Sequence, residues 1–129
     1  MRDYGTNRLW ALAQRLIALT EQGKVSWSEG AAADSFQLAA SSASVTIASR
    51  DADGRAPFQL DVYSDSGTVV DSLESELRWD EEAQVDYPAE WNDALETLYE
   101  RAKRSALNID TVIDSLIAEL PEPDTAPPF

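Results

Sequence analysis

The middle of the chain consists of short runs in which apolar and polar residues alternate, separated by turn residues. The clearest run holds Phe58, Leu60 and Val62, and a period of two is typical of a strand with one buried face. Residues 51–54 and 64–67 flank this run and are rich in the Asp, Ser and Gly that form tight turns. Shorter alternating runs occupy residues 24–28, 35–40, 44–50 and 68–73. Because strands joined by tight turns pair with their neighbours, we expect an antiparallel meander of four to five strands, apolar on one face and polar on the other.

Helical patterns lie on both sides of this region. Leu9, Ala13 and Leu16 recur at helical spacing, which predicts a helix over residues 6–22. A second helix is predicted over residues 88–107 and a third over residues 110–120. The apolar side chains of the third helix, expected to face inward, are Val112, Ile113, Leu116, Ile117 and Leu120. The predicted fold class is α+β, with an N-terminal helix, a β-meander and two C-terminal helices packed on one sheet face.

The chain has 129 residues, which suits one domain. Residues 1–120 are predicted to form this single α+β domain, and residues 121–129 an acidic, proline-rich disordered tail. Trp10, Trp27 and Trp91 lie on apolar faces of predicted elements and are expected in the core.

The chain contains no cysteine and no histidine. This composition excludes disulfides, thiol nucleophiles, Ser-His-Asp triads and most zinc sites. The five glycines are scattered and form no phosphate-binding loop, and no Gly-x-Ser-x-Gly motif is present. We therefore expect a protein that is not an enzyme and holds no cofactor or metal.

The formal net charge is −14, and residues 29–87 carry thirteen acidic side chains against three basic ones. Such a surface repels phosphate backbones and anionic lipid, so neither nucleic acid nor a membrane is expected as a partner. A protein with a basic surface would be attracted. The polar N-terminus lacks the apolar core of a secretory signal, which favours a cytoplasmic location.

Residues 71–86 hold seven acidic residues against Arg78, with Leu77 and Trp79 interspersed. No period is convincing there, and an ordered acidic loop and a short helical turn both fit. A tryptophan surrounded by carboxylates suits an anchor for a basic partner. The alternative is that Trp79 folds back over the sheet edge. The predicted partner-binding residues are Trp79, Asp80, Glu81, Glu82, Glu76 and Asp86.

Three other acidic residues have simpler interpretations. Asp51 and Asp53 begin like a calcium loop, but Gly54 comes too early and Val62 stands where the bidentate Glu belongs, so a hairpin turn is expected. Asp61 lies within the strongest strand pattern, on the face predicted to be solvated.

The order of elements resembles that of small bacterial α+β proteins of uncharacterised function. The motifs that carry this resemblance are Gly23-Lys24-x-x-Trp27, the alternating strand and turn over residues 58–67, and the Leu98-Tyr99-x-x-Ala pattern that continues to Ala106. The resemblance covers nearly the whole chain and implies an accessory role in a bacterium without pointing to any chemistry.

Three functions are compatible with these features. The first is a non-catalytic acidic protein-binding module, an accessory or regulatory subunit. The second is an antitoxin, immunity-type inhibitor or nucleic-acid mimic that blocks a basic protein. The third is a small-ligand or Mg²⁺-dependent enzyme that uses the open sheet face. The apolar strand faces are also compatible with a homodimer.

Overall fold

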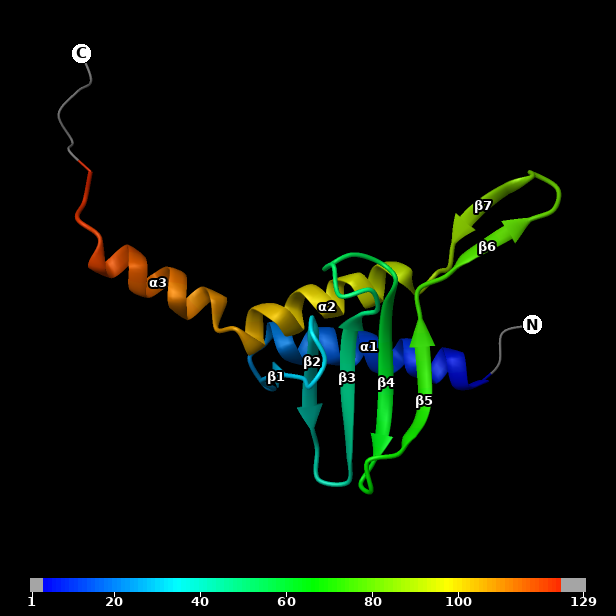
Figure 1. Ribbon diagram of the computed structural model, residues 1–129, viewed down its shortest axis with the longest axis horizontal. Coiled ribbons are helices and arrows are strands. Elements are labelled where there is room, and N and C mark those ends of the chain that lie inside the picture. The colour runs from blue at the N-terminus through cyan, green and yellow to red at the C-terminus, as the bar shows by residue number, and fades with distance from the viewer. Residues whose placement is uncertain (1–3, 124–129) are drawn as a thin grey trace, which may run out of the picture.

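The computed structural model describes residues 4–123 and shows an α+β architecture with two sheets (Figure 1). Its helices are α1 (Tyr4–Glu21), α2 (Asn92–Ala106) and α3 (Ile109–Glu119). The strands of the larger sheet are β1 (Ser28–Glu29), β2 (Ser35–Ala39), β3 (Ala43–Ser49), β4 (Phe58–Ser64) and β5 (Val69–Glu74). The strands of the smaller sheet are β6 (Leu77–Asp80) and β7 (Val85–Pro88).

The larger sheet is an antiparallel meander in the order β1-β2-β3-β4-β5, which confirms the predicted topology. Its register aligns Phe36 with Ile47, Ile47 with Leu60, and Leu60 with Leu73. This row crosses four strands on one face, and all four side chains are buried. The period-2 pattern therefore decided the register, because a slip by one residue would turn the whole row to solvent.

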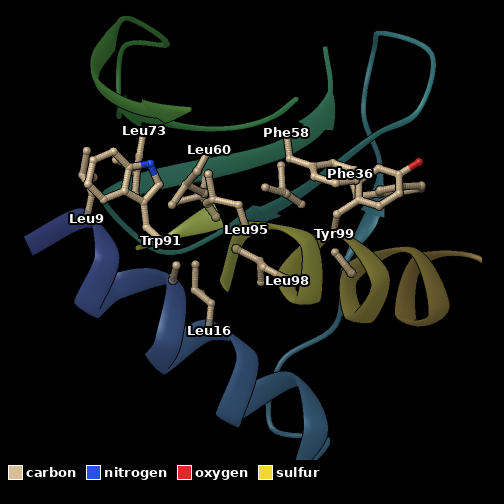
Figure 2. Close-up of a cluster of buried hydrophobic side chains, with 14 of the residues drawn as sticks. Leu9, Leu16, Phe36, Phe58, Leu60, Leu73, Trp91, Leu95, Leu98 and Tyr99 are labelled. Atoms are coloured by element: carbon tan, nitrogen blue, oxygen red, sulfur yellow. The ribbon is translucent and has the colours of Figure 1, made fainter. Parts of the chain in front are cut away.

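α1 and α2 lie side by side on this apolar face (Figure 1). Figure 2 shows side chains of both helices directed towards those of the sheet, among them Leu16 of α1 and Leu95 and Leu98 of α2. Trp27 and Trp91 are buried as predicted, whereas Trp10 is half-buried and packs against the edge of the core.

The connection from α1 to the sheet differs from the prediction. Residues 24–28 were expected to form a strand, but only Ser28 begins β1. Trp27 is instead held by the two helices: its indole N–H donates to Thr20 Oγ1 at 2.9 Å, and its backbone N–H donates to Ser105 Oγ at 2.9 Å. Trp27 belongs to the buried core, so its place in the alternating pattern reflects contact with the helices rather than strand pairing.

The start of α2 was also predicted too early. Pro88 belongs to β7, and the helix begins at Asn92 after a turn in which the Asn92 N–H donates to the Ala89 carbonyl at 3.1 Å. Proline suits either the first turn of a helix or the end of an edge strand, so its identity alone does not separate the two.

The prediction that α3 packs inward is wrong. No residue of α3 is buried, and the helix extends away from the end of α2 (Figure 1). Asn108 lies between the helices in the left-handed conformation, with φ of 52°. Because α1 and α2 already cover the apolar sheet face, no buried position is left for α3. Of the predicted tail, residues 124–129 lie outside the described residues.

Candidate functional site

Residues 71–74 of the acidic segment complete β5, and the rest of the segment forms most of the β6–β7 hairpin, which projects from the end of the larger sheet (Figure 1). The expectation of a loop or a helical turn is therefore wrong. Trp79 pairs with Asp86, and Arg78 pairs with Tyr87. Two short alternating triplets, Leu77-Arg78-Trp79 and Val85-Asp86-Tyr87, correspond to the two strands, but each is too short to predict a strand by its period alone.

The turn of the hairpin is organised by Asp80. Its Oδ1 accepts hydrogen bonds from the backbone N–H groups of Glu82 at 2.9 Å and Ala83 at 3.1 Å. The Asp80 carbonyl accepts a third from the N–H of Gln84 at 2.8 Å, and Gln84 is left-handed with φ of 57°. Asp80 thus stabilises the turn, whereas the side chains of Glu81 and Glu82 are exposed.

Four large apolar side chains of the hairpin are exposed, each by between 43% and 69%. Directly paired residues point to the same side of an antiparallel ribbon. Leu77 and Trp79 therefore share one face of the hairpin, and Val85 and Tyr87 share the other. Trp79 therefore does not fold back over the sheet edge. The sequence analysis did not identify Leu77, Val85 and Tyr87 as exposed residues of the candidate site.

The base of the hairpin is fixed by the N-terminal end of α2. The Asn92 side chain accepts from the N–H of Glu76 at 3.1 Å and donates to the Glu76 carbonyl at 2.9 Å. The Trp91 indole N–H donates to the Glu74 carbonyl at 2.8 Å. The Arg78 guanidinium lies 5.5 Å from the centre of the Trp91 ring. The hairpin therefore projects from a buried tryptophan rather than from a free loop.

The six predicted partner-binding residues all lie on this hairpin or at its base. Glu76 stands at the base with its carboxylate 3.9 Å from Arg78, and Asp86 lies opposite Trp79. Glu81 and Glu82 are at the tip, beside Asp80. Over residues 76–90 the chain carries six carboxylates and one guanidinium, so the exposed apolar side chains lie in a strongly negative surround.

The open face of the larger sheet is the second candidate site. A depression of about 390 Å³ is lined by small and polar residues of β2, β3 and β4 and by the residues after β1. Its one carboxylate, Asp61, accepts hydrogen bonds from Gln59 Nε2 at 2.8 Å and Ser72 Oγ at 2.6 Å. Acid–base catalysis by paired carboxylates needs a second carboxylate, which this lining does not supply.

The segment that begins like a calcium loop in sequence is a turn between β3 and β4. Asp53 Oδ1 accepts from the Arg55 backbone N–H at 2.9 Å, and this hydrogen bond lowers the pKa of the Asp53 carboxyl. The carboxylate is thus directed at its own turn. Over residues 4–123, no three Asp, Glu, His or Cys side chains are grouped so as to hold a metal ion.

No protein-family model, curated protein or solved structure matches the chain. Within the described range, none of the helices combines the length and apolar character needed to cross a membrane.

Proposed function

We propose that this chain is a non-catalytic, cytoplasmic protein-binding module, an accessory or regulatory subunit that binds a basic protein surface through the β6–β7 hairpin. The observation that carries the proposal is the exposure of four large apolar side chains on a segment with six carboxylates and one guanidinium. A monomeric protein rarely concentrates apolar side chains on a narrow projection unless another molecule covers them.

The two kinds of side chain have different roles in such an interface. The exposed Glu81, Glu82 and Asp86 attract a basic partner over the range of a Debye length, which raises the rate of encounter. Trp79 then supplies the large apolar contact area that anchors such interfaces. Salt should therefore weaken the attraction more than it weakens the anchor.

The rigid base of the hairpin lowers the entropic cost of binding. The hydrogen bonds of Asn92 and Trp91 hold the strands before any partner arrives, so less conformational freedom is lost on association. This distinguishes the hairpin from a disordered acidic segment, which would have to fold as it binds.

The test is affinity capture with the tagged full chain, at low and at high salt, followed by mass spectrometry. Truncation of an anchor of this kind costs at least about 2 kcal/mol, so Trp79→Ala should weaken the complex by about 30-fold or more. Glu81→Lys with Glu82→Lys should also weaken it, and should remove most of its dependence on salt.

The matched control reverses two exposed carboxylates elsewhere. Asp51→Lys with Asp65→Lys changes the net charge equally but lies in the turns after β3 and β4. This variant should retain the complex. If all variants bind equally well, the hairpin is not the interface.

The acidic tip also favours a narrower form of the proposal, an inhibitor that mimics nucleic acid. Glu81, Glu82 and Asp86 present carboxylates to a cleft that normally binds phosphates. Capture of a nuclease or toxin whose activity falls on addition of the chain, but not of the Glu81→Lys, Glu82→Lys variant, would establish this form. An unaffected captured enzyme would exclude it.

A further inference from the structure

α3 presents an apolar stripe that no described part of the chain covers. Val112, Ile113, Leu116 and Ile117 are each between 44% and 69% exposed. In a helix that advances 100° per residue, these side chains and Ile109 fall within an arc of about 140°. Leu120 follows directly after the helix and is 61% exposed. The stripe is as regular as that of a packed helix.

The charged residues of α3 all have one sign, and two of them border this stripe. Asp110 lies about 20° beyond one edge of the arc and Glu119 about 20° beyond the other, whereas Asp114 lies about 60° beyond the edge, towards the opposite side of α3. Residues 105–129 contain no basic side chain. Asp110 is paired with Arg104 at 2.5 Å across the junction between α2 and α3. Glu119 is therefore the carboxylate that most directly faces whatever covers the stripe.

We propose that α3 is a docking helix that inserts its apolar stripe into an apolar groove of a partner protein, and that lysine or arginine side chains border this groove. Amphipathic helices bind such grooves through side chains at positions i, i+3, i+4 and i+7. Ile109, Val112, Ile113 and Leu116 occupy these four positions. The carboxylates on both borders of the stripe select a groove with basic rims.

The charge of α3 argues against two other binding partners for the stripe, a second copy of the chain and a membrane surface. In a pair of α3 helices from two copies, each helix brings three carboxylates and no basic residue, and like charges across an interface cost affinity. A helix that lies on a membrane surface normally carries Lys or Arg on its polar face, because anionic lipids attract them. α3 carries neither.

This docking helix is independent of the hairpin interface. The hairpin is fixed to the start of α2, and α3 follows its end (Figure 1). The 15 residues of α2 place these ends about 22 Å apart. Loss of hairpin binding therefore leaves α3 intact, and the two proposals fail separately.

The absence of cysteine makes a site-specific test direct. Ile113→Cys places a single thiol within the stripe, and Ala118→Cys places one on the opposite side of α3. Each full-length variant is labelled with a benzophenone maleimide, mixed with a lysate of its host cells and illuminated. The cross-linked peptides are then identified by mass spectrometry.

We expect an adduct from position 113 and none from position 118, mapped to an apolar groove with lysine or arginine at its rim. Its yield should fall as salt is raised from about 0.01 M to about 1 M, which shortens the Debye length from about 30 Å to about 3 Å. Adding Leu116→Asp should abolish the adduct. The same substitution in the unlabelled chain should leave the melting temperature within about 2 °C, since exposed positions contribute little to stability.

Four results would overturn the proposal. They are an adduct between two copies of the chain, equal adducts from both positions, a mapped site without basic residues, and no adduct from position 113. Unfolding caused by Leu116→Asp would also overturn it, because the stripe would then belong to the chain's own core. Sedimentation of the unlabelled protein supplies a further check, since a dimer that Leu116→Asp dissociates assigns the stripe to a second copy.

Discussion

α2 and α3 follow one another in the chain and both carry an apolar stripe, yet they have opposite environments. α2 buries Leu95, Leu98, Tyr99 and Ala102 against α1 and the sheet. α3 buries no residue at all. The comparison teaches that an amphipathic pattern specifies a face to be covered but not the molecule that covers it. Substitutions in and around the two helices test this contrast.

The largest difference is expected for the same substitution made in each stripe. Leu98 is fully buried, so Leu98→Ala should lower the free energy of unfolding by about 2–5 kcal/mol through lost transfer energy and a cavity. Leu116→Ala should change it by no more than about 0.5 kcal/mol. Urea unfolding followed by tryptophan fluorescence measures both. An equal loss of unfolding free energy in the two variants would show that α3 is packed in solution.

An intermediate effect is expected at the start of α2. Asn92→Ala removes both side-chain hydrogen bonds to the Glu76 backbone, with a loss of about 1 kcal/mol. The loss should be local, so amide hydrogen exchange should accelerate in β6 and β7 but not in β3 and β4. Asn108→Gly, which retains the left-handed residue before α3, is the control and should leave exchange in the hairpin unchanged. Exchange that is equally fast in the hairpin of both variants would contradict the role of Asn92.

The smallest effect is expected at Tyr99, whose ring packs 4.8 Å from that of Phe58 and 5.6 Å from that of Phe36 (Figure 2). Within the described part of the chain, its buried hydroxyl has no partner in hydrogen-bonding geometry. Replacing it by hydrogen leaves no buried polar group unsatisfied, so Tyr99→Phe should be neutral or slightly stabilising at pH 7.

The same substitution has a consequence at alkaline pH. Burial raises the pKa of the Tyr99 phenol above its ordinary value, and the negative charge of Asp34 adds to the rise. The unfolded chain releases this proton at about pH 10. The contribution of Tyr99 to stability is thus complete below about pH 10 and is lost as the pH rises through the folded-state pKa. Tyr99→Phe should therefore reduce the alkaline loss of stability, measured by urea unfolding as the pH is raised. Identical alkaline profiles for the two proteins would refute this.

The sheet and α1 were predictable because their signals are local. Alternation at Phe58, Leu60 and Val62 and the turns around them specify strands, register and the buried face. The helical spacing of Leu9, Ala13 and Leu16 specifies α1 in the same way. The candidate site was predicted only as a set of residues. The negative charge and Trp79 were evident, but the pairing that makes them a hairpin was not.

The sequence by itself determined the class of fold, the polarity of each sheet face and the concentration of negative charge, because these depend on residue type and spacing alone. Only the tertiary structure decided which apolar residues are covered. Trp91 and Asn92 fix the hairpin through contacts with Glu74 and Glu76, more than fifteen residues earlier in the chain. α3 remains uncovered because α1 and α2 already cover the apolar face of the sheet. A local sequence pattern shows that a helix is amphipathic, but it does not show which of several amphipathic helices covers that face.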